Sequence, residues 1–526
     1  MLETMTETRT AAPMRAIVRV ERRVGLLVES RWTVAVAAAA AFLLRLPGLT
    51  RPVRADEAGF VLVARTWDPM ADSLYGAYFV DRPPLLIALF KASDAIGGPL
   101  FIRLVGAFAC AALVLAAAWV ARLVADDQAA RWTAVATAAL STNVLIDAVA
   151  VKGELLALPV LMASLGLSLV AVRDRSWQRA LAAGLLAGLA LGFKQNLVGG
   201  IVFAAVLLVG SWRAGRLTRS ELLRLSAAAA AGAAVPVLAT VGWAVASGVR
   251  VHTLWYAVYG FRFDASHVLA GDADNAPTIR AGLLVLAAIG AGMLLIIGGF
   301  LAHIRAEWRD DPPLTAAIAA MLAVDVVGLA LGGSFWRDYL FPLLPATALC
   351  AALLARRSNS RGTAMRAVIA AAAASTVLCL VGWVFYNVSG LQEYDEHDTG
   401  VALRDVAEPS DTLVVYGGRA DLQLESGLAS PYAYLWSLPM RTLDPELADL
   451  DALVTGPEPP TWIVEWVEFR HWDEVDGGRL AGLVDEYYVR QGTGCGDRPI
   501  WLLRGVDREV PEPVCHGSGF IFTSGP

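Results

Sequence analysis

Long apolar runs alternate with short arginine-bearing connectors from residue 33 to about residue 389. A run of roughly 17–25 apolar residues is long enough to cross a bilayer as one helix. The pattern therefore predicts a polytopic α-helical membrane protein with about 11 transmembrane helices. The expected spans are residues 33–49, 100–122, 132–150, 154–172, 180–193, 197–211, 226–247, 281–300, 315–333, 339–355 and 366–388.

The stretch 180–211 allows two interpretations, because Phe193-Lys194-Gln195-Asn196 interrupts it and each half is short for a span. Either two short helices meet at a polar notch near the outer face, or one long helix bends there. A single helix would reverse the orientation of every later span and place arginine-rich connectors outside. The positive-inside rule disfavours that outcome. We therefore expect two short helices.

Residues 390–526 have a different character, because the apolar runs stop and acidic side chains dominate. This segment holds 25 acidic and 9 basic residues, against 24 and 34 in residues 1–389. Its β-rich runs at 412–416, 461–467 and 501–503 predict an α/β fold. We expect two domains: a transmembrane catalytic domain, 1–389, whose outer loop 50–99 carries the active site, and a soluble domain, 390–526.

Overall composition narrows the class of protein. Of 526 residues, 56% are hydrophobic and 17% are charged, and the net charge is −6. A soluble globular chain has about 25% charged residues. These values exclude a soluble enzyme, a nucleic-acid binder and a disordered scaffold, and they leave membrane lipids as a certain partner.

Charge and cysteine placement set the expected topology. Arginines precede the first span and fill alternate connectors, which predicts a cytoplasmic N-terminus in a multi-pass plasma-membrane protein. Eleven spans then place the C-terminal domain outside the cytoplasm. Cys495 and Cys515 are the only cysteines in that domain. We expect them to form a disulfide in an oxidising compartment, and a pair of free thiols is the alternative.

Acidic residues follow the first expected span almost at once, at Asp56 and Glu57. Glu57, Val61 and Ala64 recur at helical spacing, so a short interfacial helix is expected to begin here with Asp56 near its N-cap. The simplest interpretation is that Asp56 only caps this helix. The functional interpretation is a general base at the bilayer surface.

Cationic residues also gather on the expected outer side. Asp81 and Arg82 precede a proline pair that suits the first turn of a helix, and all three lysines, Lys91, Lys152 and Lys194, fall on that face. A surface ion pair and snorkelling helix ends are the structural explanations. Binding of a phosphate at the outer leaflet is the functional one. The sequence contains no zinc, DxD, P-loop, GxSxG or GxGxxG motif in a suitable context, so we expect no metal and no cofactor.

Several short motifs along most of the chain fit one pattern. They are the run Arg54–Arg65, the run Tyr78–Leu85 with its Asp-Arg-Pro-Pro core, Phe101–Leu104, Ser141–Glu154, Arg337–Pro345, Asp411–Gly417 and Arg419–Tyr432. Together they resemble the polyprenyl-phosphate-sugar-dependent branch of the GT-C glycosyltransferases. That branch includes protein O-mannosyltransferases, aminoarabinose transferases and actinobacterial cell-wall arabinosyl- and mannosyltransferases. Arg82 stands where many relatives have His or Lys.

The resemblance implies an inverting glycosyltransferase that moves a sugar from a polyprenyl-phosphate donor to an envelope glycan, lipid or protein at the outer membrane face. The alternative is a membrane transporter or flippase of lipid-linked sugars. The resemblance makes Asp56 the catalytic base, with Glu57 next to it, and Asp81 and Glu154 second acids that orient the acceptor. Candidates for binding the donor phosphate are Arg82, Lys194, Arg262, Arg337 and Tyr339.

The C-terminal domain has two expected roles. It can act as a lid over the site, or it can recognise a carbohydrate acceptor through aromatic side chains. The side chains expected to make that recognition are Tyr432, Tyr434, Trp436, Trp462 and Trp466.

Overall fold

The structure is a computed structural model that describes residues 28–270, 276–357 and 360–516. Its contacts divide the chain into two compact units. The first, here the helical unit, comprises Met1–Leu49, Arg103–Thr240 and Asp274–Gly382. The second, here the mixed unit, comprises Thr50–Ile102, Val241–Ala273 and Trp383–Pro526. The expected outer loop 50–99 thus groups with the C-terminal segment, whereas the sequence-based division assigned it to the transmembrane domain.

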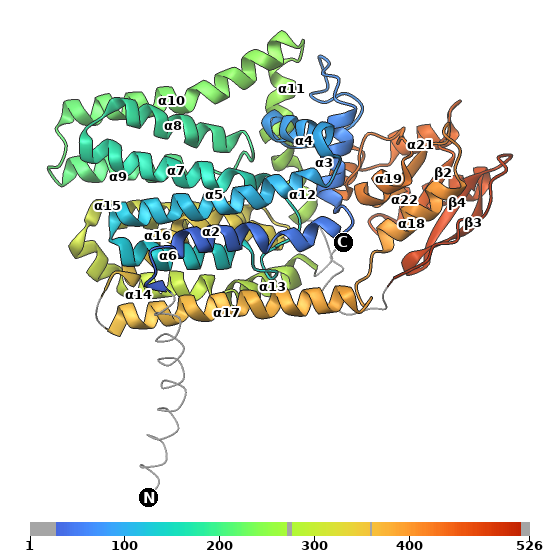
Figure 1. The fold of residues 1–526 in the computed structure, drawn as a ribbon. Coiled ribbons are helices and arrows are strands. Elements are labelled where there is room, and N and C mark those ends of the chain that lie inside the picture. The colour runs from blue at the N-terminus through green and yellow to red at the C-terminus, as the bar shows by residue number, and fades with distance from the viewer. Residues whose placement is uncertain (1–27, 271–275, 358–359, 517–526) are drawn as a thin grey trace, which may run out of the picture. The chain divides into compact units, whose positions relative to one another are not determined.

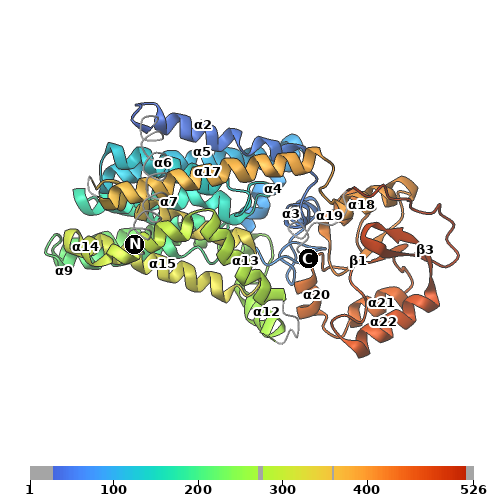
Figure 2. The same ribbon diagram turned by 90° about the horizontal axis from the view of Figure 1, so that it is seen from below.

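Long apolar helices run alongside one another in the helical unit (Figures 1 and 2). Helix α7 packs against α8 and α9, α9 packs against α15, and α6 packs against α2 and α16. The helices are α2 (Thr33–Leu43), α5 (Phe101–Val124), α6 (Asp127–Ser141), α7 (Gly153–Asp174), α8 (Trp177–Leu191), α9 (Gly199–Arg213), α10 (Arg219–Ala246), α13 (Ala276–Gly290), α14 (Met293–Asp310), α15 (Pro312–Leu331), α16 (Leu344–Ala355) and α17 (Ser360–Val388), with the 3-10 turns η1 (Leu46–Thr50) and η3 (Arg337–Leu343).

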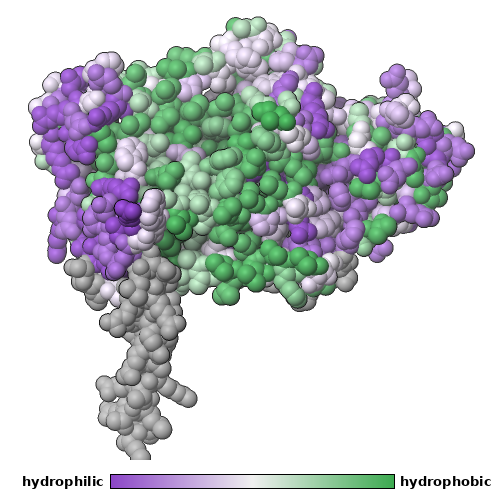
Figure 3. Space-filling model, in the orientation of Figure 1, coloured by the Kyte–Doolittle hydropathy of each residue, from purple (hydrophilic) through white to green (hydrophobic). Residues whose placement is uncertain are grey.

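The surface of these helices suits a lipid environment. Hydrophobic side chains cover the middle of the helices in Figure 3, and hydrophilic residues gather at one end of the bundle. Exposed apolar residues include Phe108 and Leu115 on α5 and Leu378 on α17. Among the described residues, seven helices are long and apolar enough to cross a membrane, or eight if α13 and α14 form one bent span. Every predicted span overlaps a helix, but the count of eleven stays a prediction.

Two predicted spans differ from the structure in shape. The expected span 132–150 is wrong beyond Ser141, where α6 ends. The side chains of Asn143 and Asp147 accept hydrogen bonds from nearby backbone N–H groups, which ends the helical pattern. Leu145 N, for example, donates to Asn143 Oδ1 at 2.9 Å. The expected straight span 281–300 is instead α13 and α14, bent by 77°. Gly292 has a φ of 85°, a left-handed conformation that glycine adopts without strain and that breaks the helix.

The stretch 180–211 forms two separate helices, α8 and α9, as the sequence analysis predicted. A turn lies between them, in which Lys194 N donates to Ala190 O and Leu197 N donates to Lys194 O. Each helix has 15 residues, which is short for a simple span.

A four-stranded sheet lies at the centre of the C-terminal part of the mixed unit. Its strands are β1 (Leu413–Tyr416), β2 (Trp462–Glu465), β3 (Tyr488–Gly494) and β4 (Arg498–Leu503), in the order β1-β2-β4-β3. Only β1 and β2 are parallel. The sheet confirms the three predicted β-rich runs and adds β3, which the sequence analysis missed. The surrounding helices are α18 (Asp395–Val406), α19 (Ala420–Ser426), α20 (Ser437–Leu443), α21 (Ala448–Thr455) and α22 (Glu474–Tyr487), with the 3-10 turn η4 (Cys495–Asp497).

Both faces of this sheet are buried. Val414 and Ile463 point into a core that α21 and α22 complete, and Leu413 and Val464 point into a second core on the side of α18 and α19. The remaining helices of the mixed unit come from the two connectors that the sequence predicts to lie outside: α3 (Ala55–Arg65), α4 (Pro84–Gly97), α11 (Val251–Trp255), the π-helical turn η2 (Tyr256–Gly260) and α12 (Phe261–Ala270).

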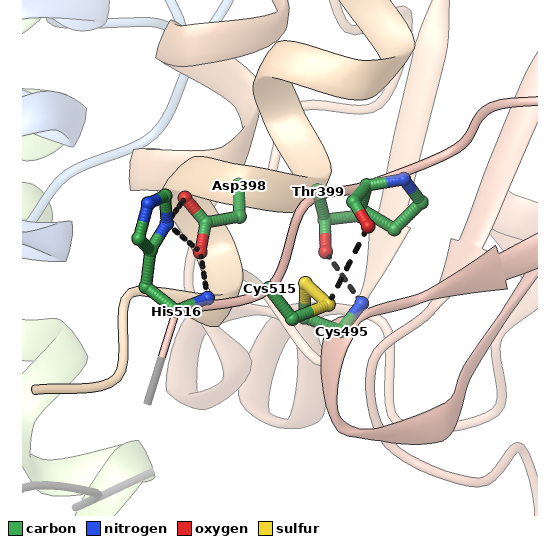
Figure 4. The surroundings of a disulfide bond; sticks show 6 residues. Asp398, Thr399, Cys495, Cys515 and His516 are labelled. Carbon is green, nitrogen blue, oxygen red and sulfur yellow. Dashed lines mark hydrogen bonds and ion pairs between the residues drawn. A yellow bond between two sulfur atoms is a disulfide. The ribbon is translucent and has the colours of Figure 1, made fainter. Parts of the chain in front are cut away.

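Cys495 and Cys515 form a disulfide, as the sequence predicts (Figure 4). The neighbouring bonds fix the end of the described chain: His516 N donates to Asp398 Oδ2 at 2.9 Å, and Cys495 N donates to Thr399 Oγ1 at 3.0 Å. Both acceptors belong to α18. The disulfide therefore attaches the C-terminal segment to η4, between β3 and β4, and the hydrogen bonds attach both to α18.

Candidate active site

Helix α3 presents Asp56 and buries Glu57. Arg54 is the extended residue before the helix, and its N–H donates to Glu57 Oε2 at 3.2 Å. Glu57 is fully buried and so stabilises the helix start in the manner of a capping box. Asp56 lies near the N-cap, as expected: Arg54 takes the N-cap position and Asp56 is the second helical residue. Asp56 is half-buried.

Trp436 holds one oxygen of Asp56. Its indole Nε1–H donates to Asp56 Oδ1 at 3.0 Å. The indole ring lies against α3 at Gly59, where an added Cβ would come within 2.1 Å of the ring. Phe60 packs against the same indole, with ring centroids 5.9 Å apart. A glycine one turn after Asp56 is therefore what allows the tryptophan to reach the carboxylate.

Asp81 joins two of the predicted cations. Arg82 Nη1 bonds Asp81 Oδ1 at 2.6 Å, and Arg262 forms an ion pair with the other carboxylate oxygen. Arg82 also lies over the ring of Phe60, 5.7 Å from its centroid. Phe60 thus contacts both Trp436, the partner of Asp56, and Arg82. The structure brings Asp56, Asp81, Arg82 and Arg262 into one connected group of side chains.

Two tyrosines fix the loop that carries Arg82. The hydroxyl of Tyr75 donates to the carbonyl of Arg82, and Tyr78 Oη accepts from Ser430 N at 3.1 Å. Burial raises the pKa of the Tyr75 phenol well above its usual range, and the charge of Asp81 raises it further. Tyr75 therefore remains a hydrogen-bond donor at neutral pH.

A second group of predicted residues lies in the helical unit. Lys194, in the α8–α9 turn, forms a buried ion pair with Glu154 on α7. The same ammonium lies over the ring of Tyr339, 4.8 Å from its centroid. Lys152 bonds Asp338 Oδ1 at 3.1 Å, a pair that the sequence analysis missed. Each lysine is thus neutralised by an acid from another element.

Arg337 takes a different position from Lys194. Its Nη1 lies 3.5 Å from the carbonyl oxygen of Val144, in the loop after α6. Asp325, on α15, lines a recess together with Lys194, Asn196 and Tyr339. Asp325 is not among the site residues that the sequence predicts.

The predicted role of the C-terminal aromatic side chains is wrong for three of the five. Tyr432, Trp462 and Trp466 are 3%, 0% and 7% exposed and belong to the two cores of the sheet. Buried tryptophan and tyrosine need partners for their polar atoms. Trp462 accordingly donates to Asp411, and Tyr432 donates to Asp444. Of the other two, Trp436 contacts Asp56, and the Tyr434 hydroxyl lies 3.5 Å from Asp449 Oδ2.

The geometry of the mixed unit suits a reaction that moves a proton and develops negative charge. Asp56 has one oxygen held by an indole N–H, which fixes the orientation of its carboxylate. Arg82 and Arg262 provide guanidinium groups, which suit phosphate oxygens better than an ammonium does. Within the described residues no group of three or more His, Cys, Asp or Glu side chains could hold a metal ion.

No family model matches the chain, and no curated protein matches it. Solved structures do. ArnT from Cupriavidus metallidurans in the apo state is 14% identical with a TM-score of 0.61, covering 89% of this chain and 97% of ArnT. ArnT bound to undecaprenyl phosphate is 15% identical with a TM-score of 0.60, covering 90% and 98%.

An oligosaccharyltransferase from Archaeoglobus fulgidus, tethered to an acceptor peptide, is also similar. It is 14% identical with a TM-score of 0.51, and the match covers 88% of this chain and 72% of the other. Both neighbours are glycosyltransferases with the GT-C fold. The expected GT-C fold is therefore confirmed, whereas the count of eleven spans and the separate C-terminal domain stay predictions.

Proposed function

We propose that this protein is an inverting glycosyltransferase that transfers a sugar from a polyprenyl-phosphate donor to an acceptor at the outer face of the membrane. The observation that carries the proposal is the group formed by Asp56, Trp436, Arg82 and Arg262 in a chain with the GT-C fold. ArnT, the structural neighbour, has been crystallised with undecaprenyl phosphate, which supports a polyprenyl-phosphate donor.

In the proposed mechanism Asp56 acts as general base. It removes the proton of the acceptor hydroxyl while that oxygen attacks the anomeric carbon from the face opposite the phosphate. The bond between the sugar and the phosphate breaks, and the lipid phosphate leaves with the electron pair. One in-line displacement inverts the anomeric configuration.

Arginine side chains would stabilise the leaving phosphate as its charge grows. Arg82 and Arg262 share Asp81, so a phosphate oxygen can take the place of part of that ion pair without burying an unpaired cation. In the helical unit we propose that Lys194 and Tyr339 bind a lipid phosphate and that Glu154 orients Lys194. The acceptor is a glycan, lipid or protein of the cell envelope.

The proposal is tested with purified protein in lipid nanodiscs, incubated with polyprenyl-phosphate arabinose or mannose and a crude envelope acceptor fraction. Release of polyprenyl phosphate together with a new glycoside of inverted configuration is the expected result. Retained configuration would contradict the single-displacement mechanism. Movement of intact lipid-linked sugar between leaflets, without release of phosphate, would instead indicate a flippase.

A further inference from the structure

The segment Val251–Ala270, made of α11, η2 and α12, has two apolar faces, one buried and one exposed. The buried face holds residues at helical spacing: Leu254, Ala257, Val258, Phe261 and Ala265. Phe261 packs against Phe79, with ring centroids 5.0 Å apart, and Phe79 lies two residues before Asp81. The buried face therefore attaches the segment to the rest of the mixed unit.

The exposed face is aromatic. Val251, Trp255 and Phe263 are 54%, 55% and 69% exposed. Tyr259 is half-buried, and its ring centroid lies 5.0 Å from that of Trp255. These four residues follow one another at intervals of four, a spacing that drifts around an α-helix with 3.6 residues per turn. The π-helical turn η2 is wound with more residues per turn and compensates the drift, so the four side chains lie along one side.

Both ends of this segment are tied to helices that could cross a membrane. Helix α10, a candidate span, ends at Ala246 in a tight turn, where Gly248 has a φ of 82° and Val249 N donates to Ala244 O. Helix α11 begins directly after this turn. At the other end, α13 begins six residues after α12 ends, and α13 is half of the bent candidate span α13–α14.

These connections decide how the segment lies on the bilayer. Helical dihedral angles continue through Tyr256 and Phe261, so the 20 residues form one helix about 30 Å long at 1.5 Å per residue. The six residues that lead back to α13 reach about 22 Å at most when fully extended. The helix therefore cannot stand upright on the bilayer, and it runs along the surface.

The chemistry of the exposed face suits a lipid interface. Tryptophan and tyrosine concentrate where the hydrocarbon core meets the headgroups, and helices that lie in this layer bury their apolar face among the lipids. A carbohydrate is the other class of partner that packs on aromatic rings. Val251 and Phe263 have no polar side-chain atom for a sugar hydroxyl, which favours the lipid.

We propose that the aromatic face formed by Val251, Trp255, Tyr259 and Phe263 inserts into the headgroup layer of the bilayer, with phospholipid as its partner. Arg262, which forms an ion pair with Asp81, is the neighbour of Phe263 on the same helix. Insertion of the face would thus hold this guanidinium at the depth of lipid phosphates. The proposal goes beyond the proposed function and does not depend on it, because the face would bind lipid without any sugar donor.

The test replaces Phe263 by p-benzoylphenylalanine, a photoreactive amino acid, in the full-length protein. The variant is reconstituted in phosphatidylcholine nanodiscs and irradiated, and intact-protein mass spectrometry measures the lipid adduct. The same replacement at Trp255 gives a second reading of the face. Val475, on α22, is 77% exposed and is the matched control outside the segment, while Leu378 on α17 is the positive control on an apolar helix.

Lipid adducts at Phe263 and Trp255 should exceed the adduct at Val475 several-fold and approach that at Leu378. Both replaced side chains are exposed, so the Tm in detergent should stay at the wild-type value. Yields at both positions no higher than at Val475 would overturn the proposal. With a crude envelope glycan fraction present, a glycan adduct in place of the lipid adduct would also overturn it and assign the face to a carbohydrate. No transfer reaction is needed, so failure of the proposed function would leave this outcome unchanged.

Discussion

Trp436 donates its indole N–H to Oδ1 of Asp56 over 3.0 Å, although 380 residues separate the two along the chain. The C-terminal segment therefore contributes directly to the group around the proposed base. This contact indicates a positioning role for Trp436 in place of the expected role in binding a carbohydrate acceptor.

Replacing Trp436 by Phe removes the N–H and keeps an aromatic ring against Gly59. A hydrogen bond to a charged group is worth about 1.5 kcal/mol or more, so the transfer rate should fall about tenfold. Losing a donor disfavours the ionised carboxylate, so the acid limb of the pH–rate profile should move to higher pH. Trp501→Phe, which loses an indole bond to Glu465 in the sheet, is the control. An unmoved acid limb in Trp436→Phe would contradict the positioning role.

Arg82→Gln should impair both donor binding and chemistry. Asp81, its partner, keeps the ion pair with Arg262 in the variant, so the fold should persist while a cation is removed from the leaving phosphate. We expect kcat/KM for the lipid donor to fall about 10²-fold. Arg65→Gln removes a more exposed guanidinium, paired with Asp94 on α4, and should retain transfer. Equal kinetics for the two variants would exclude Arg82 from the site.

Variants of Lys194 and Glu154 test whether this ion pair contributes to transfer or only to the stability of the helical unit. Lys194→Met leaves Glu154 buried without its lysine, which should cost about 3–5 kcal/mol and lower the Tm. The double variant Lys194→Met, Glu154→Gln should regain most of that stability because no buried charge is left alone. We expect it to remain deficient in transfer. A double variant that recovers both Tm and transfer would show that Lys194 has a structural role alone.

Cys515→Ser tests the disulfide and the side of the membrane on which it lies. The disulfide closes a loop with a sequence separation of 20 residues, which should add about 3 kcal/mol to the free energy of unfolding of the part of the mixed unit that contains the sheet. Mass spectrometry of the unreduced wild-type protein should find one peptide pair linked through Cys495 and Cys515. In Cys515→Ser, a membrane-impermeant thiol reagent should label Cys495 on intact cells after mild unfolding. Labelling that requires permeabilised cells would contradict the extracytoplasmic placement.

Much of the architecture could be predicted because its signals are local. The apolar runs, the helix that carries Asp56, the proline pair at the start of α4 and three of the four strands follow from hydropathy and turn chemistry within short windows. Strand β3 was missed because it is a polar edge strand with little apolar alternation. The end of α6 was missed because Asn143 and Asp147 compete for backbone N–H groups inside an apolar run.

The site itself was predictable only in part. Asp56, Arg82 and Lys194 were identified as candidates because they are charged residues near the expected outer face. Charge beside a membrane is costly and therefore usually serves a function. Which side chains pair could not be predicted, because Asp56 with Trp436 and Lys152 with Asp338 join segments far apart in sequence. Trp462 looked like a surface aromatic in an alternating run, but the sheet is covered on both faces and buries it.

The central claim is that Asp56 is the catalytic base, and Asp56→Asn tests it most directly. The isosteric amide can still accept from Trp436 but cannot take a proton, so donor binding should be retained while transfer falls about 10²–10⁴-fold. Asp68→Asn, an exposed carboxylate after the same helix, is the matched control. The measurement is release of polyprenyl phosphate by purified protein in nanodiscs. The account predicts a loss in Asp56→Asn alone, and wild-type turnover by that variant would contradict it.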